Sequence, residues 1–216
     1  MKVKICGIKR IEDALKAIEY GADAIGLLVG QTHSSRDFID EHTAKAIVRQ
    51  LPPFCSTVLV THLTNIEEIV KLAEFIGVTT VQLHGNSLPD DILQIKNRVE
   101  HIKIVKSLHV INEKSIEEGL KYLSEADAIL LDTINIATNQ IGGTGLTHDW
   151  DLSRQIVDYY KIPAILAGGL NPDNVEKAIS KVHPFAVDVN SGVKDPDGFK
   201  DYKKLKLFIS KAKCAD

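Results

Sequence analysis

The chain has 216 residues, of which 44% are hydrophobic and 25% charged, and its formal net charge is −3. This composition is ordinary for a globular protein, and the intermixed charges exclude a basic face for nucleic acid. No apolar run reaches the roughly 18 residues of a membrane span, and strand-like sequence begins at once, without a signal-peptide pattern. We therefore expect a cytoplasmic protein whose partners include neither membrane nor nucleic acid.

Short apolar runs typical of strands alternate with helix-like runs along the whole chain. The predicted strands are Val3–Cys6, Ala24–Val29, Ser56–Val60, Thr80–Leu83, His101–Lys106, Ala128–Leu131, Ala164–Ala167 and Phe185–Val189. The helices that follow them are predicted at Arg10–Tyr20, Glu41–Leu51, Ile66–Ile76, Asp90–Arg98, Glu113–Leu123, His148–Tyr160, Pro172–Lys181 and Phe199–Lys211. Asn65 and Asn171 are predicted to cap two of these helices, with Pro172 as the first helical residue.

Eight strand–helix units indicate an α/β protein with a parallel sheet covered by helices. In 216 residues they fit one (β/α)₈ TIM barrel domain over residues 1–216, and an open doubly wound sheet is the alternative. The units are short and similar, and no linker divides them, which favours the barrel. Several strands also carry polar residues on one alternating face, as an interior face would: Lys4 and Cys6, Gln82 and His84, Asp188 and Asn190. The lysine-rich segment Lys200–Lys213 is predicted to be the solvated face of the last helix.

In such barrels the active site lies at the carboxyl ends of the strands. Glycine-bearing turns follow the last strands, and backbone N–H groups there can bind phosphate. The glycines predicted to do so are Gly168, Gly169 and Gly192, together with Gly143 and Gly145 in the turn before His148. The alternative is that these glycines only permit tight turns.

Cys6 and Asp132 are an unlike pair at two strand ends. A thiolate can remove a proton and a carboxylic acid can donate one, provided that the pKa of the thiol is lowered toward neutrality. Lys4, two residues before Cys6, is expected to favour the thiolate. The alternatives are a buried cysteine that only packs and an aspartate that only caps a turn.

The other polar candidates have less specific patterns. Asp188 is either a charge partner of Lys4 or a substrate contact. The remaining cysteines, Cys55 and Cys214, are predicted to be packed or surface thiols. Three histidines near strand ends are predicted to be structural and not to form a metal site: His33, His84 and His148. Trp150 is predicted to pack its helix against the barrel. The odd, widely spaced cysteines favour reduced thiols, as in the cytoplasm.

Six motifs in order make nearly the whole chain resemble the phosphoribosylanthranilate isomerase family of tryptophan biosynthesis. They are KICGIKRIEDA at Lys4–Ala14, VQLHG at Val81–Gly85, LLDT at Leu130–Thr133, GGTGLTHDW at Gly142–Trp150, LAGGLNPDNV at Leu166–Val175 and VDVNSGV at Val187–Val193. The resemblance implies an Amadori rearrangement of an aminoaldose to an aminoketose, without metal or organic cofactor. It implies Cys6 as general base, Asp132 as general acid, and a phosphorylated sugar as substrate. The phosphate of this sugar would rest on Gly143, Gly145, Gly168, Gly169, Ser191 and Gly192.

The same resemblance implies that Asp188 touches substrate hydroxyls, with Asn190 beside it, and that Arg36 binds the anthranilate carboxylate. Two loops depart from the family pattern: GLLVGQTHSSRDFID lacks the usual Ser-Pro-Arg, and VLVTHLTN places His62 where an apolar residue is usual. Asn190 also replaces a usual serine. A related isomerase or lyase with another aryl substrate, and a non-catalytic phosphosugar-binding protein, are the alternative functions. The oligomeric state is expected to be monomer or homodimer.

Overall fold

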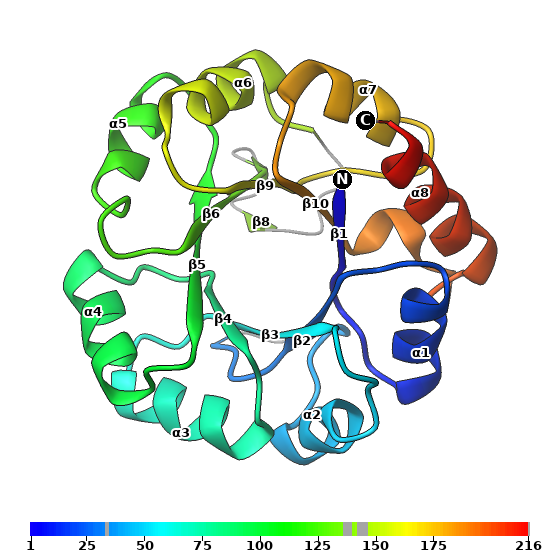
Figure 1. Cartoon of the computed structure of the whole chain (residues 1–216), viewed down its shortest axis with the longest axis horizontal. Coiled ribbons are helices and arrows are strands. Elements are labelled where there is room, and N and C mark those ends of the chain that lie inside the picture. The colour runs from blue at the N-terminus through cyan, green and yellow to red at the C-terminus, as the bar shows by residue number, and fades with distance from the viewer. Residues whose placement is uncertain (33–34, 136–139, 142–146, 216) are drawn as a thin grey trace.

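The computed structural model describes residues 1–32, 35–135, 140–141 and 147–215, which form a closed barrel of eight parallel strands inside a ring of helices (Figure 1). The barrel strands are β1 (Lys2–Ile5), β2 (Ala24–Leu28), β3 (Ser56–Thr61), β4 (Thr80–Leu83), β5 (Lys103–His109), β6 (Ala128–Asp132), β9 (Ala164–Leu166) and β10 (Ala186–Val189). The helices are α1 (Ile11–Glu19), α2 (Glu41–Val48), α3 (Ile66–Ile76), α4 (Pro89–Arg98), α5 (Lys114–Leu120), α6 (Trp150–Tyr159), α7 (Val175–Val182) and α8 (Tyr202–Cys214).

Pairing of the first and last strands closes the barrel. β1 pairs in parallel with β10, where Lys4 lies opposite Asp188, and with β2 on its other side. The predicted barrel is therefore confirmed, and the open sheet is excluded. Closure sends alternate side chains to the interior, so the end of each strand can deliver a polar group to one shared mouth.

Helix α3 shows how local sequence produces the outer ring. The side chain of Asn65 accepts a hydrogen bond from the Glu68 N–H at 3.2 Å, as predicted for a capping residue. Gly77 ends the helix in the left-handed conformation, with φ of 81°. Between them, Ile69, Ala73 and Ile76 recur at helical spacing and are buried against the barrel.

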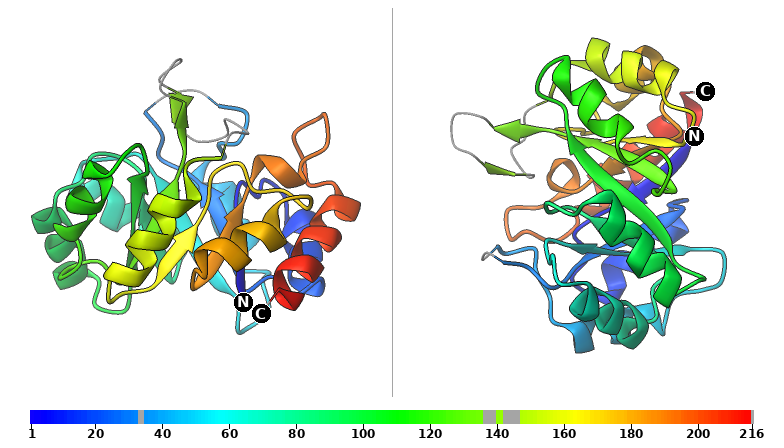
Figure 2. Two further views of the ribbon diagram at one scale, coloured as in Figure 1. Left: turned by 90° about the horizontal axis from the view of Figure 1, so that it is seen from above. Right: turned by 90° about the vertical axis from the view of Figure 1, so that its left-hand side faces the viewer.

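Three features differ from the sequence-based expectation. Helix α7 begins at Val175, because Asn171 instead forms a turn in which its Oδ1 accepts from the Asp173 N–H at 2.8 Å. The predicted cap at Asn171 is therefore wrong. A short antiparallel pair, β7 (Ile134–Asn135) and β8 (Gln140–Ile141), follows β6, where no strand was predicted. Figure 2 shows this pair projecting from the end of the barrel opposite the two termini.

The third difference concerns Lys200. It precedes helix α8 and is only 3% exposed, so the prediction of a solvated lysine at this position is wrong. Helix α8 starts at Tyr202 because Asp201 caps it, accepting from the N–H groups of Lys203 and Lys204 at 2.9 and 3.1 Å. Within this helix Lys203, Lys204 and Lys206 are exposed, as predicted, whereas Lys211 and Lys213 are partly buried.

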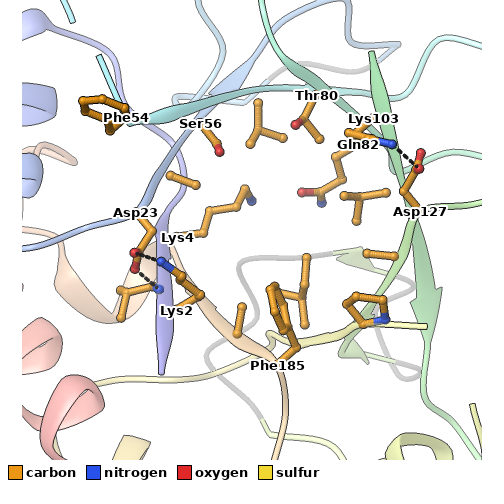
Figure 3. A pocket seen from close by; sticks show the side chains of 18 residues that line it. Lys2, Lys4, Asp23, Phe54, Ser56, Thr80, Gln82, Lys103, Asp127 and Phe185 are labelled. Atoms are coloured by element: carbon orange, nitrogen blue, oxygen red, sulfur yellow. Dashed lines mark hydrogen bonds and ion pairs between the residues drawn. The ribbon is translucent and has the colours of Figure 1, made fainter. Parts of the chain in front are cut away.

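A cavity of about 520 Å³ opens at the amino-terminal ends of the strands, away from the predicted site (Figure 3). The first residues of the strands line it, with Lys4 and Gln82 at its inner end. Phe54 at its rim is fully exposed and has φ of 66°, and Phe185 is also exposed. Across the described ranges, no helix is long and apolar enough to cross a membrane.

Candidate active site

Cys6 follows β1 directly and its side chain is buried, with 6% of the residue exposed. Its N–H donates to the Val189 carbonyl at 2.9 Å, which fixes the main chain at the mouth of the barrel. Burial raises the pKa of the Cys6 thiol, while the charges of Lys4 and Lys200 lower it. The expected net lowering of this pKa is thus absent, because burial outweighs the two nearby ammonium groups.

Lys4 and Asp188 form a buried ion pair across β1 and β10, with Nζ and Oδ2 2.8 Å apart. Asp188 is therefore a charge partner of Lys4. Its second oxygen, Oδ1, is buried and has no hydrogen-bond partner within the described residues. The pair acts on both predicted catalytic groups: Lys4 favours the ionised forms of Cys6 and Asp132, and Asp188 disfavours them.

Asp132 ends β6 and is buried, with 7% of the residue exposed. Its Oδ1 accepts from the Thr133 N–H at 2.8 Å, and its Oδ2 lies 3.5 Å from Nε2 of His84. Burial, assisted by the charge of Asp188, raises the pKa of Asp132 to about 6. A carboxyl group with this pKa is still partly protonated near neutrality, as a general acid requires.

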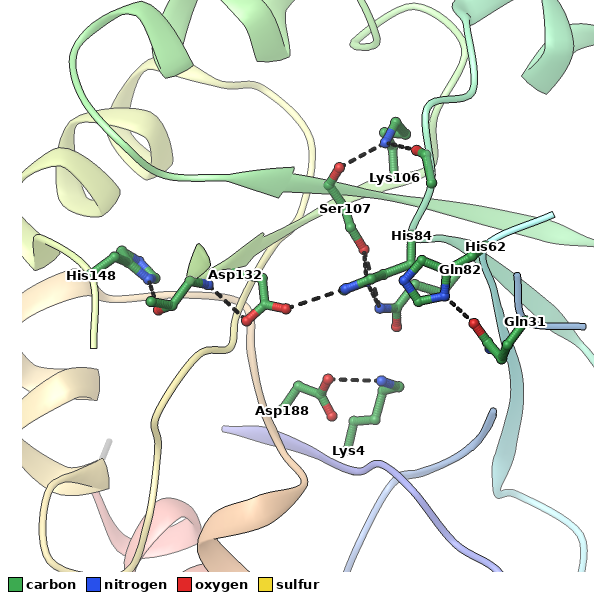
Figure 4. A network of polar contacts seen from close by, with 12 residues as sticks. Lys4, Gln31, His62, Gln82, His84, Lys106, Ser107, Asp132, His148 and Asp188 are labelled. Carbon is green, nitrogen blue, oxygen red and sulfur yellow. Dashed lines mark hydrogen bonds and ion pairs between the residues drawn. The ribbon is translucent and has the colours of Figure 1, made fainter. Parts of the chain in front are cut away.

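A network of histidines and polar side chains lines the mouth beside Asp132 (Figure 4). Ser107 Oγ lies 2.8 Å from Nδ1 of His84 and 3.2 Å from the Gln82 amide. The rings of His62 and His109 contact the His84 ring edge to face, with centroids 4.9 and 5.6 Å away. Burial and the neighbouring cationic groups hold the pKa of His84 well below its ordinary value, so this imidazole is neutral.

His148 and Trp150 have the structural positions that were predicted. His148 lies 2.9 Å from Thr133 Oγ1 and 2.6 Å from Ser153 Oγ, so it joins the end of β6 to helix α6. Trp150 packs against the hydrophobic core. Within the described ranges, no group of three or more His, Cys, Asp or Glu side chains is arranged to hold a metal ion.

The turns after β9 and β10 lie against each other. Gly168 and Gly169 have φ of 78° and 66°, and their N–H groups have no acceptor in the part of the chain that the structure describes. A Cβ at Gly192 would lie 2.0 Å from the Leu170 carbonyl oxygen, so these two turns approach too closely for a side chain. Ser191 precedes it in a 3₁₀ turn. Gly143 and Gly145 lie outside the described residues.

Arg36 and Asn190 are two further predicted substrate contacts. Arg36 is exposed in the loop after β2, and its carbonyl accepts from Lys9 Nζ at 3.1 Å. Asn190 is held within the protein: its Nδ2 donates to Asp37 at 2.9 Å and its Oδ1 accepts from Lys200 at 3.1 Å.

Two residues near Cys6 escaped the sequence-based reasoning. Lys200 donates to the Cys6 carbonyl oxygen at 2.6 Å. Gly26 on β2 leaves room for the thiol, because a Cβ there would lie 2.9 Å from Cys6 Sγ. The sequence around Lys200 is typical of a lysine-rich helix, and Gly26 resembles any other glycine in a strand. Neither pattern therefore indicated a contact with Cys6.

Comparison with known proteins agrees with this arrangement. The model of the family described as N-(5'phosphoribosyl)anthranilate (PRA) isomerase matches residues 3–211. N-(5'-phosphoribosyl)anthranilate isomerase 2 of Methanosarcina mazei is 50% identical over 213 residues, covering 99% of this chain and 94% of that protein. The crystal structure of phosphoribosyl anthranilate isomerase from Thermotoga maritima superimposes with a TM-score of 0.88 at 40% identity, covering 99% and 98% of the two chains.

A second crystal structure contains a phosphoribosyl anthranilate isomerase in complex with reduced 1-(o-carboxyphenylamino)-1-deoxyribulose 5-phosphate. It superimposes with a TM-score of 0.85 at 38% identity and covers 99% of this chain and 98% of that one. Matches of this length and identity, together with the closed barrel and the polar residues at its mouth, establish that the chain belongs to the N-(5'-phosphoribosyl)anthranilate isomerase family.

Proposed function

We propose that this chain converts N-(5'-phosphoribosyl)anthranilate to its 1-deoxyribulose 5-phosphate aminoketose, with Asp132 as general acid and Cys6 as general base. Asp132 donates a proton to the ribose ring oxygen, and the C1′–oxygen bond breaks to give an open-chain Schiff base. Cys6 then removes the C2′ proton, and the electron pair of that C–H bond forms the enolamine. Tautomerisation gives the ketone. The observation that carries this proposal is the buried, partly protonated carboxyl of Asp132 at the same mouth as a thiol.

The Lys4–Asp188 pair supports the role of Cys6 as base and a contact of Asp188 with the substrate. An ammonium group beside the thiol stabilises the thiolate that must form before the C2′ proton is removed. The unpartnered Oδ1 of Asp188 is available to accept a hydrogen bond from a substrate hydroxyl, since a buried carboxylate oxygen is most stable with a donor. Asp188 thus supports a substrate contact through one oxygen while the other stays on Lys4.

The phosphate would bind at the turns after β9 and β10, through Gly168, Gly169, Ser191 and Gly192. The support is that the first two N–H groups have no acceptor among the described residues and that close packing excludes side chains there. Gly143 and Gly145 remain predicted contacts. At the other side of the mouth, the exposed guanidinium of Arg36 would bind the anthranilate carboxylate in a charge-assisted hydrogen bond.

Steady-state kinetics on N-(5'-phosphoribosyl)anthranilate tests this function. Cys6→Ser and Asp132→Asn should each lower kcat by about 10²–10⁴-fold, the usual contribution of a general acid or base. KM should change little, because phosphate binding relies on backbone groups elsewhere. Complementation of a tryptophan auxotroph that lacks this step is the matching test in cells. Folded wild-type protein without turnover would refute the function, and unchanged kcat in Cys6→Ser would refute the mechanism.

The amino-terminal face supports a homodimer. Phe54 projects fully exposed beside a cavity on the same face, so two copies related by a two-fold axis can each insert Phe54 into the other. One solved relative is described as a monomer generated from dimeric phosphoribosylantranilate isomerase of Thermotoga maritima; it is 36% identical, and the match covers 99% of this chain and 98% of that one. A cytoplasmic location is supported by the three free thiols.

A further inference from the structure

Lys200 lies beneath the mouth of the barrel, at the ends of β1 and β10. The parallel ladder between these strands stops where the Cys6 N–H meets the Val189 carbonyl. Beyond that point the carbonyl oxygens of Cys6 and Asn190 both accept from Lys200 Nζ, at 2.6 and 3.2 Å. Lys200 therefore supplies hydrogen bonds to both main chains where the backbone pairing of β1 and β10 ends.

The number of acceptors matches the charged form of Lys200. An ammonium group has three N–H donors, whereas a neutral amine has two. The third acceptor is Oδ1 of Asn190, at 3.1 Å. Since Lys200 is buried, with 3% exposed, it is held by these three oxygens in place of solvent. Asn190 supplies two of the three, one of them through the side chain that stands where a serine is usual.

We propose that Lys200 is a positioning residue for Cys6, which fixes the main chain that carries the thiol and places a buried positive charge that stabilises the thiolate. Since Cys6 is the proposed general base, this role rests on the proposed function. Lys200 contacts the Cys6 carbonyl and is buried beneath the mouth, so it acts through Cys6. Lys4 favours the same thiolate from the other side, within the ion pair with Asp188.

Charged groups from four segments face Lys200, and they determine how it responds to pH. Burial and then the charge of Lys194 lower the pKa of Lys200, while Cys6, Asp37 and Asp188 oppose this, and its three oxygen acceptors favour the ammonium form. Asp13 accepts from its backbone N–H at 3.2 Å. Loss of the ammonium removes a positive charge near the thiol, so the pKa of Cys6 rises and the thiolate fraction at a given pH falls.

The test is a pH titration of the Cys6 thiolate by its ultraviolet absorbance, in protein with Cys55→Ser and Cys214→Ser so that one thiol remains. Cys6→Ser in this background is the blank. Lys200→Met should raise the midpoint by about one pH unit or more, which corresponds to an about tenfold lower thiolate fraction. At a given pH kcat should fall with the thiolate fraction, and KM should change less than kcat. Lys203→Met, an exposed lysine three residues along, is the control and should leave the midpoint unchanged.

Asn190→Ser provides a second variant if Lys200→Met does not fold. It retains Lys200 and both main-chain acceptors but removes Oδ1, so the midpoint should rise in the same direction by a smaller amount. An unchanged midpoint in folded Lys200→Met, or in Asn190→Ser where only that variant folds, would overturn the role of Lys200. An equal shift in Lys203→Met would do the same. Because the titration needs no turnover, a failed isomerase assay and a failed role for Lys200 give different results.

Discussion

The Nε2 atom of His84 lies 3.5 Å from Oδ2 of Asp132, and the imidazole that carries it is neutral. The other ring nitrogen, Nδ1, lies 2.8 Å from Ser107 Oγ and 3.3 Å from the Gln82 amide, which hold the ring in place. Because the imidazole is neutral, it brings no full positive charge against the carboxyl. Burial, assisted by the charge of Asp188, therefore keeps Asp132 partly protonated near neutral pH.

The raised pKa of Asp132 predicts an inverse relation between activity and stability. The folded state holds the proton more tightly than the unfolded chain, whose value is near 3.8, so the free energy of unfolding decreases as pH rises from about 4 to about 6. Asp132→Asn removes the free-energy cost of ionising this buried carboxyl group. At about pH 8 we expect it to be more stable than the wild type by up to about 3 kcal/mol while losing activity. Urea unfolding at about pH 8 and about pH 4 measures this, and the same difference at both pH values would contradict it.

Arg36→Ala tests the aryl side of the site. If Arg36 binds the anthranilate carboxylate, its loss removes a charge-assisted hydrogen bond of about 1.5–3 kcal/mol, and KM should rise at least about tenfold. Arg49→Ala, which removes an exposed arginine at the end of α2, is the matched control. An unchanged KM in Arg36→Ala would refute this contact and favour another aryl substrate.

Gly168→Ala tests the phosphate turn. The new Cβ would lie 2.2 Å from Thr133 Oγ1 and 2.8 Å from the Thr133 nitrogen, so the turn must move. We expect weaker inhibition by inorganic phosphate and a higher KM. Gly77→Ala is the control, because Gly77 shares the positive φ, at 81°, but has open space for a Cβ. Phosphate inhibition that weakens equally in both variants would indicate backbone strain in place of a phosphate contact.

Gly26→Ala tests the space around the thiol. The added methyl group would lie 2.9 Å from Cys6 Sγ and 3.1 Å from Lys4 Cε, so one of these side chains must shift. Because Cys6 is the proposed base and Lys4 stabilises its thiolate, kcat should fall more than KM rises. Steady-state kinetics and thiolate absorbance measure the two effects. A variant with wild-type kcat would show that the position of the thiol is not restricted by β2.

Phe54→Glu tests the amino-terminal face. A glutamate at this fully exposed position lacks the aromatic ring that would fill the cavity, and its carboxylate would have to lose its hydration there, so the homodimer should dissociate. Analytical ultracentrifugation measures the change. Leu93→Glu, at an exposed apolar site on α4, should leave the assembly intact. A wild-type protein that sediments as a monomer at all concentrations would contradict the proposed homodimer.

The sequence predicted the eight strand–helix units because each relies on local signals, namely short apolar runs and polar caps such as Asn65. It also placed Cys6 and Asp132 correctly at strand ends, which follows from the parallel register. It missed the β7–β8 pair because each strand has only two residues, too few for a periodic pattern.

The environment of each site residue was beyond prediction for a physical reason. Lys200 is buried by acceptors from segments 194 and 10 residues away in sequence, and a lysine-rich helix pattern gives no sign of them. Likewise, Asn190 reaches Asp37 across 153 residues. The thiol pKa depends on the balance of burial against two lysines, one of which was assigned to solvent.

Lys4 and Gln82 belong to both ends of the barrel. They line the inner end of the amino-terminal cavity, and the same side chains contact Asp188 and Ser107 at the mouth. One layer of side chains thus separates the two ends. During evolution, a substitution that reshapes the cavity floor also displaces the charge that supports the thiolate, so selection for turnover constrains both ends of the barrel together.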